Sequence, residues 1–264
     1  MMKVRPLHPH AALLAEEGAD AADGSGNGNG NKRYVVVSDL HVGLEGELGA
    51  RGITVRPGLA GEMAAELSAL AASQKAALVL LGDVKSTVGE ISRQEWDDIP
   101  ALFARLAAQT DVYLVPGNHD GNIRHLLPET VNVAAGRGMV IGDTLFVHGH
   151  TMPSAVRSGV RRIVMGHLHP VFFKKGSVLA GERVWIYLQV KKEALFAAGE
   201  GGVLDIIVVP SFNRYLYAGE RMRKKSTSPI MARVIEKGAI LKCMVATLDG
   251  SIVGDEQSAL NDVL

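Results

Sequence analysis

Cysteine is almost absent from this sequence, since Cys243 is the only one in 264 residues. A single cysteine excludes an internal disulfide, fits a reducing compartment and disfavours a structural zinc site built from several thiolates. Cys243 itself lies in the apolar run of residues 240–246, which indicates a core position and not a nucleophile.

Long hydrophobic runs are absent as well. The apolar patch at residues 11–15 is followed by acidic residues. It is too short for the hydrophobic region of a signal peptide, and far short of the roughly 20 residues that a membrane helix needs. We therefore expect a cytoplasmic protein without a membrane partner.

The chain also lacks an excess of charge of either sign. Lys and Arg together number 28, Asp and Glu together number 28, and the formal net charge is zero. No global field therefore attracts nucleic acid or an anionic surface, and any attraction to phosphate has to be local. With 47% hydrophobic residues, the chain has enough apolar surface for one large domain.

A low-complexity tract separates the start of the chain from the rest. Residues 18–31 read GADAADGSGNGNGN, a composition that cannot bury enough apolar surface to offset its ordering entropy. The residues before the tract carry no pattern that places them on a domain. We therefore predict an N-terminal segment with a flexible linker over residues 1–31, and one domain over residues 32–264.

From residue 33 onward, short β-rich runs alternate with helical patterns, and Ser92 with Glu95 forms a capping box that opens one of the helices. This order predicts parallel β-α-β units with right-handed crossovers. The patterns predict strands over 34–37, 77–81 and 112–115, and helices over 59–73 and 92 to about 108.

The second half of the chain is dominated by predicted strands joined by short turns. They fall at residues 139–141, 144–147, 163–165, 184–190, 204–209, 244–248 and 252–253. We therefore expect an α/β (α+β) fold in which two facing mixed β-sheets are sandwiched by helices.

Polar residues follow directly on five of these strands. The ligand crevice of an open α/β sheet lies outside the carboxyl ends of its strands, so all five loops can converge on one site. A lone histidine or aspartate at a strand end is as often a polar cap, but five such loops in order indicate one functional centre. The loops read DLH (39–41), GD (82–83), GNHD (117–120), HGH (148–150) and GHLH (166–169).

The side chains of these loops suit two divalent cations. Carboxylate and amide oxygens are ligands for Mn²⁺ or Mg²⁺, and imidazole nitrogen is a ligand for Zn²⁺, Fe²⁺ or Mn²⁺. In pairs spaced by two, such as Asp39 with His41 and His167 with His169, an extended loop directs both side chains the same way. Each such pair can hold a metal ion from one side.

Five short motifs, SDLHVG, LLGD, PGNHD, VHGH and GHLH, resemble the successive motifs of the calcineurin-like metallophosphoesterases. More narrowly, GLEGELGARGITVRP, GDVKS and MGHLHP are similar to the SbcD-related archaeal phosphoesterases, a group named for its likeness to the nuclease subunit of double-strand-break repair. The resemblance covers about residues 34–212 and implies the four-layer sandwich of that family.

The resemblance also implies two metal ions and seven ligands. We expect Mn²⁺, with Zn²⁺, Fe²⁺, Ni²⁺ and Mg²⁺ as alternatives. Neutral Asn and His ligands would keep such a site positive and attractive to phosphate. The ligands implied by the family pattern are Asp39, His41 and His169 for one metal, Asn118, His148 and His167 for the other, and Asp83 as a bridge.

His119 and Asp120 are the predicted catalytic residues. His119 is not needed to complete either metal shell, and an imidazole can donate a proton to a leaving alkoxide near neutral pH. Asp120 is its neighbour in sequence and is expected to orient the ring.

Four further residues are predicted to contact the substrate: Lys85, His150, Arg161 and Arg162. For Lys85 the alternative is a solvated loop lysine. His150 competes with His148 for one ligand position, and His148 is preferred because it directly follows a predicted strand. Lys85 precedes a departure from the family pattern, since this chain has Ser86 where an Asp or Asn is common.

The resemblance implies hydrolysis of a phosphodiester, in nucleic acid or a nucleotide, by a hydroxide that bridges the two metals. A phosphomonoesterase is one alternative, because the short chain leaves no room for a capping domain. A scaffold that has kept the fold and lost the chemistry is another, which is disfavoured because every ligand position is filled. The sequence indicates no protein partner.

Overall fold

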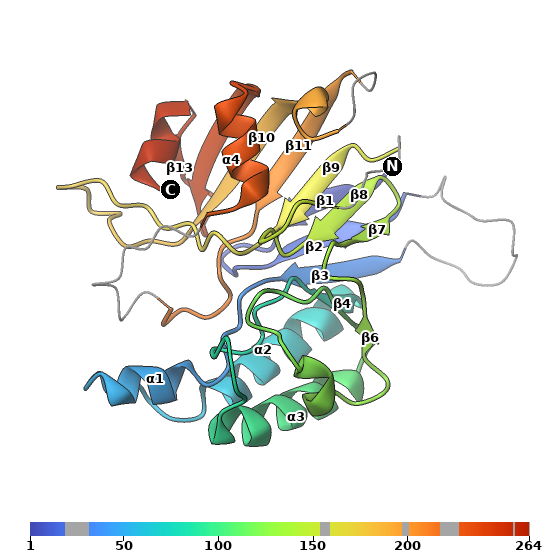
Figure 1. Cartoon of the computed structure of the whole chain (residues 1–264), viewed down its shortest axis with the longest axis vertical. Helices are drawn as coiled ribbons and strands as arrows, with labels where there is room; N and C mark the ends of the chain where they lie inside the picture. Colours follow the sequence, from blue (N-terminus) through green and yellow to red (C-terminus); the bar gives the residue numbers. More distant parts are fainter. Residues whose placement is uncertain (19–31, 154–158, 197–200, 217–226, 256, 264) are drawn as a thin grey trace, which may run out of the picture.

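The computed structural model describes residues 1–18, 32–153, 159–196, 201–216, 227–255 and 257–263. Within them, two β-sheets face each other (Figure 1). The first has the order β1-β2-β3-β4-β5-β6, with β1 (Lys3–Pro6), β2 (Leu13–Glu16), β3 (Arg33–Val37), β4 (Ala77–Leu80), β5 (Val112–Leu114) and β6 (Asn132–Val133). The second has the order β13-β12-β10-β11-β9-β8-β7, with β7 (Met139–Ile141), β8 (Thr144–Val147), β9 (Arg162–Met165), β10 (Val184–Lys191), β11 (Val203–Val208), β12 (Ile240–Thr247) and β13 (Ile252–Gly254).

Helices cover the outer faces of both sheets, which confirms the predicted sandwich. Figure 1 shows α2 and α3 against the first sheet and α4 against the second. No helix in the described part of the chain has the length and apolar character needed to cross a bilayer. The helical elements are α1 (Leu44–Ala50), α2 (Leu59–Gln74), α3 (Arg93–Ala107) and α4 (Pro229–Glu236), with short 3-10 turns η2 (Ile123–Leu126), η3 (Lys192–Ala194) and η4 (Gln257–Asp262).

The apolar run of β3 shows how the layers are built. Its side chains alternate between the two faces of the sheet, as in any strand. Val35 and Val37 pack with the cluster under α2 and α3, whereas Tyr34 and Val36 pack against residues of the second sheet such as Trp185. Because both faces are covered, the strand is apolar without alternation.

Strands β1 and β2 belong to the first sheet, so the start of the chain is part of the domain from which the sequence pattern set it apart. The hairpin of β1 and β2 pairs with β3, and Leu13 and Leu14 are fully buried. The apolar patch that is too short for a signal peptide is therefore a core strand. The expected linker over residues 18–31 lies outside the described residues except for Gly18.

Parallel pairing brings the functional loops together. Strands β3, β4, β5 and β6 run parallel in the first sheet, and β8, β9 and β11 run parallel in the second. The loops after parallel strands emerge at one edge of each sheet, and in this fold those two edges meet.

Candidate metal centre

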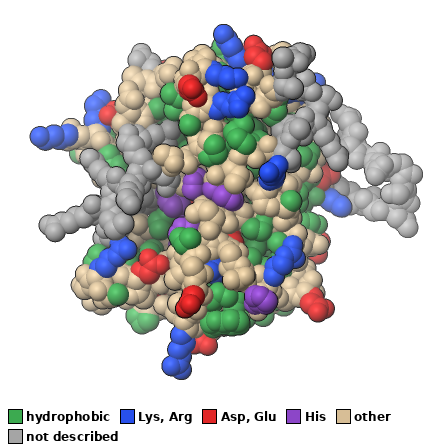
Figure 2. Space-filling view, viewed as in Figure 1, with side chains coloured by type: hydrophobic (Ala, Val, Ile, Leu, Met, Phe, Trp, Pro, Cys, Tyr) green, Lys and Arg blue, Asp and Glu red, His purple; other side chains and the backbone are tan. Residues whose placement is uncertain are grey.

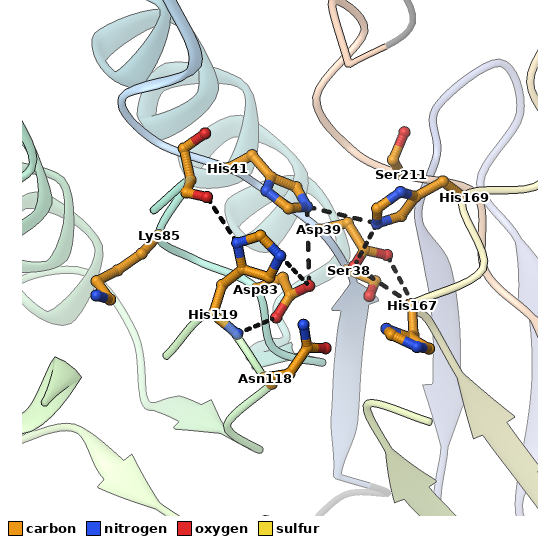
Figure 3. Close-up of polar contacts among 12 residues, drawn as sticks. Ser38, Asp39, His41, Asp83, Lys85, Asn118, His119, His167, His169 and Ser211 are labelled. Atoms are coloured by element: carbon orange, nitrogen blue, oxygen red, sulfur yellow. Dashed lines mark hydrogen bonds and ion pairs between the residues drawn. The ribbon is translucent and has the colours of Figure 1, made fainter. Parts of the chain in front are cut away.

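The structure brings all seven predicted ligands together at the carboxyl ends of the strands. The side chains of the six that are labelled in Figure 3 point toward one another, and Nε2 of His148 lies 3.1 Å from Nδ1 of His167. Asp39 and His41 follow β3, Asp83 follows β4, Asn118 follows β5, His148 follows β8, and His167 and His169 follow β9.

The ligand atoms form two groups that share one carboxylate. Within each group, the candidate ligand atoms lie within 4.8 Å of one another. Asn118 adds an oxygen to the second group, because its Oδ1 lies 3.2 Å from Nε2 of His148. The groups coincide with the two ligand sets that the family resemblance implies: Asp39, His41, Asp83 and His169 in one, and Asp83, His148 and His167 in the other.

Distances within the groups fit a shared cation. Nε2 of His41 lies 3.4 Å from Nε2 of His169, and Nε2 of His148 lies 3.1 Å from Nδ1 of His167. Two ligands on bonds of about 2.1 Å are roughly 3.0–3.4 Å apart when the angle between the bonds is octahedral or tetrahedral. These two nitrogen–nitrogen distances therefore match those between two ligands of one metal ion.

His148 is held with its ligand nitrogen facing the centre. Its Nδ1–H donates to the carbonyl of Leu81 at 2.7 Å, and this bond leaves Nε2 directed at Asp83 Oδ2, 3.2 Å away. Burial lowers the pKa of His148, but the hydrogen bond and charge of Asp83, with the charge of Asp39, outweigh it and raise the pKa to about 9. The oxygens that attract this proton would equally attract a cation.

His41 and His167 stay neutral, the form in which an imidazole binds a metal ion. Burial, followed by the neighbouring His169, lowers the pKa of His41 to about 3. Burial, followed by the charge on His148, lowers the pKa of His167 to about 4. These two rings therefore offer free nitrogen lone pairs at neutral pH.

The two carboxylates are ionised despite full burial. Burial favours the protonated form of Asp39, but His169 at 3.1 Å and His148 at 3.8 Å outweigh it, and the pKa lies below its ordinary value. The pKa of Asp83 is lowered in the same way, against burial, by His148. Two buried anions close to each other make a cavity that favours positive charge, which the proton on His148 supplies here and a metal ion could supply in its place.

Most of the candidate ligands have a strained backbone. Among the described non-glycine residues, seven have positive φ, and five of those are predicted ligands: Asp39 (59°), His41 (43°), Asp83 (49°), His167 (70°) and His169 (44°). This left-handed conformation is unfavourable for residues with a Cβ and tends to concentrate at functional sites. Residue type and spacing did not predict this conformation.

Two glycines let the loops approach the centre. A Cβ on Gly117 would overlap the Oδ1 atom of Asp83, and a Cβ on Gly166 would overlap the Oγ atom of Ser38. Only glycine therefore fits at these two positions without displacing the loop that carries a candidate ligand.

His119 lies beside the centre, but Asp120 does not orient it. Nε2 of His119 is 3.8 Å from Asp83 Oδ2, while its Nδ1–H donates to the backbone carbonyl of Ser86 at 2.6 Å. The carboxylate of Asp120 points the other way and accepts from the backbone N–H groups of Val84, Lys85 and Gly117. Asp120 therefore ties two loops together, and its predicted contact with the ring is absent.

Three of the four predicted substrate contacts lie away from the cluster. Lys85 is fully buried, so it is not a solvated lysine, and it points away from the centre to donate to the carbonyl of Gly89 (Figure 3). Arg161 and Arg162 lie at the amino end of β9, the opposite end from His167. Arg162 donates instead to the carbonyl of Met2 and to Asp205.

His150 is the predicted contact that does lie at the centre. Its ring centroid is 5.3 Å from that of His148 and 6.2 Å from that of His167. Burial lowers its pKa, and its buried Nδ1 has no hydrogen-bond partner among the described residues. It flanks the candidate ligands without joining either group.

Asn213 is a residue that the sequence analysis missed. It is fully buried after β11, and its side-chain amide donates to the backbone carbonyls of Leu40 and His41. It thereby holds the loop that carries two left-handed ligands. The signal was available, because Asn213 follows a strand parallel to β9, like the other site loops.

A family model for calcineurin-like phosphoesterases matches residues 32–168, more than half of the chain. The chain belongs to this family. The match ends one residue before His169 and does not distinguish the SbcD-related group, which stays a prediction.

Two of the solved structures that are similar to this chain are distant from it in sequence. A nuclease MPE from Pseudomonas putida is 17% identical, covers 82% of this chain and 84% of its own, and has a TM-score of 0.48. The protein of unknown function AQ665 from Aquifex aeolicus is 18% identical, covers 52% of this chain and 78% of its own, and has a TM-score of 0.36. No curated protein matches the chain.

Proposed function

We propose that this calcineurin-like phosphoesterase hydrolyses phosphodiesters with two divalent cations held by the two ligand groups. The observation that carries the proposal is the sharing of Asp83, because a carboxylate common to both groups would place two cations side by side. Such a pair supplies an activated water and positive charge for the phosphoryl oxygens.

The protein's own groups have separate tasks in this proposal. The two buried carboxylates and the imidazole and amide ligands hold the cations. His119 is not part of either group, and its Nε2 faces the same space beside Asp83. It is therefore placed to donate a proton or a hydrogen bond to the leaving oxygen of the ester.

A phosphodiester in nucleic acid or a nucleotide is our preferred substrate, by family analogy. Figure 2 shows histidine side chains at the molecular surface, midway between the two halves of the molecule. No membrane contact and no protein partner form part of the proposal.

Metal analysis combined with a substrate panel tests this function. The full-length chain should bind two Mn²⁺ and hydrolyse bis(p-nitrophenyl) phosphate, and single-stranded DNA, duplex DNA, RNA and cyclic dinucleotides would identify the natural class. Activity on p-nitrophenyl phosphate alone would favour the phosphomonoesterase. Two bound Mn²⁺ ions without turnover of any phosphoester would favour the scaffold.

His119→Gln tests the mechanism. Both metals should stay bound, and turnover of an ester with a poor leaving group should fall by about 10² to 10⁴, the usual contribution of general acid catalysis. The loss should be much smaller for a nitrophenolate leaving group, which needs no proton. An unchanged rate for both esters would exclude His119 from catalysis.

A further inference from the structure

Glu95 is a buried carboxylate whose hydrogen bonds exceed what its helix needs. It is fully buried at the start of α3 and completes the capping box with Ser92. In that box, Oε2 of Glu95 accepts from the backbone N–H of Ser92 at 2.7 Å, and the backbone N–H of Glu95 donates to Oγ of Ser92 at 3.2 Å. These two bonds are all that helix capping requires.

The other oxygen of Glu95 binds the loop that follows Asp83. Oε1 accepts from the backbone N–H of Ser86 at 3.0 Å and from the backbone N–H of Thr87 at 2.9 Å, and the Thr87 hydroxyl lies 2.9 Å from Oε1 and 2.7 Å from Oε2. Burial favours the protonated form of Glu95, but the hydrogen bonds from Thr87 and Ser92 outweigh it, so the pKa lies below its ordinary value. The group at the centre of this network is therefore an anion.

One of these bonds leads directly to His119. The N–H of Thr87 and the C=O of Ser86 belong to the same planar peptide unit and point in opposite directions. Glu95 binds the N–H side of this unit, and the Nδ1–H of His119 donates to the C=O side at 2.6 Å. A carbonyl accepts and cannot donate, so the hydrogen of this contact is on Nδ1 and Nε2 is left facing Asp83.

We propose that Glu95 is a positioning residue for His119 and acts through the Ser86–Thr87 peptide unit. Glu95 fixes the plane of the peptide, and its charge polarises the carbonyl as an acceptor, since hydrogen bonds in a chain strengthen one another. The ring of His119 is thereby held in one orientation, with Nδ1 occupied and Nε2 directed at the reacting ester. The kinetic part of this inference rests on the proposed function, whereas the geometric part does not.

The network explains two features of the site that the sequence left unconnected. Asp120 binds backbone N–H groups elsewhere, and the Ser86 side chain is a hydroxyl, so neither residue supplies a carboxylate to His119. Glu95, at the start of α3, is a carboxylate that reaches His119 indirectly, through the Ser86–Thr87 peptide unit. Ser86 contributes its backbone, while its hydroxyl donates to Glu47 at 2.6 Å.

The alternative is that Glu95 only caps α3, and Ser92 offers the matched control. Ser92→Ala removes the side-chain half of the capping box and leaves the bonds from Glu95 to Ser86 and Thr87 in place. Glu95→Gln removes the charge and turns an amide N–H₂ toward a backbone donor, whichever way the amide is oriented. Both variants should lower the melting temperature, and only Glu95→Gln should disturb His119.

The first readout needs no activity. Nitrogen-edited NMR of the histidine side chains is recorded on the full-length chain with added Zn²⁺, which is diamagnetic, and the His119 signals are assigned from their loss in His119→Gln. The wild type and Ser92→Ala should show a protected Nδ1–H on His119. In Glu95→Gln this signal should shift or broaden. An unchanged signal in Glu95→Gln would overturn the proposal, whether or not the protein is a phosphoesterase.

The second readout is kinetic. With metal content equal, Glu95→Gln should slow hydrolysis of an ester with a poor leaving group by about 10- to 100-fold, the effect of misplacing a reacting group. A nitrophenyl ester should be affected far less, and Ser92→Ala should leave both rates near the wild type. In a protein that already carries His119→Gln, adding Glu95→Gln should not lower the rate of hydrolysis further. An equal loss in that background, or the same loss in Ser92→Ala, would show that Glu95 acts only on the fold.

Discussion

Because His169 has positive φ, we expect glycine at this position to give a more stable protein than alanine does. A non-glycine residue in this conformation costs about 1–2 kcal/mol, so the five strained ligands store roughly 5–10 kcal/mol. That sum is comparable with the whole net stability of an ordinary domain. His169 is the most suitable probe, because its side chain is 18% exposed and its removal leaves no sealed cavity, whereas the side chain of Asp39 is fully buried.

We expect His169→Gly to be more stable than His169→Ala by about 1 kcal/mol in the metal-free chain. Both variants lose the same ring, so their difference reports only the backbone. His148 is the matched control, because it is a candidate ligand without positive φ. There the order should reverse, with His148→Ala more stable than His148→Gly by roughly 0.5–1 kcal/mol.

Urea unfolding in the presence of a chelator measures all four variants. The difference between the two sites should amount to roughly 1.5–2 kcal/mol, the sum of the two opposite effects. If His169→Ala is as stable as His169→Gly or more stable, the backbone of His169 is not strained. If His169→Gly is the more stable variant and does not bind metal, the strained backbone at His169 is maintained for metal binding at a cost in stability.

Three further predictions concern the metals. Asp83→Asn should lower the occupancy of both metal positions in elemental analysis, whereas His41→Ala should lower mainly one; full retention of both metals by Asp83→Asn would contradict the shared role. His148→Ala should lose more metal and activity than His150→Ala, since only His148 belongs to a ligand group, and the opposite order would exchange their roles. Metal uptake at pH 7 should release about one proton from His148, whose pKa is about 9, and none from His41, whose pKa is about 3, so affinity should rise with pH up to about 9. Calorimetry in two buffers of different ionisation enthalpy counts these protons, and zero release would refute the assignment.

The general plan of the site could be predicted because strand ends are readable in the sequence. Apolar runs at β3, β4, β5, β8 and β9 end at the polar residues that the structure brings together. Loops that follow parallel strands lie at the same edge of the sheet, and this rule predicts that the polar residues in them form one site. The same rule applied to β11 would have found Asn213.

Closeness in sequence did not predict contacts between side chains at two places. His119 and Asp120 are adjacent, yet the ring faces Ser86 and the carboxylate faces Val84. Arg162 is close to His167 along the chain, but an extended strand separates them. Contacts of this kind depend on local torsions, which composition and periodicity do not encode.

The division of the ligands between two sheets has a consequence for the order of folding and metal binding. Asp39, Asp83 and Asn118 are synthesised with the first sheet, whereas His148, His167 and His169 appear only when the second sheet is made. Neither group is complete until the two sheets have docked, so a cation would select the finished sandwich over every earlier state of the chain. Metal would then bind late in folding, and the free metal concentration would set how much it stabilises the docked sheets.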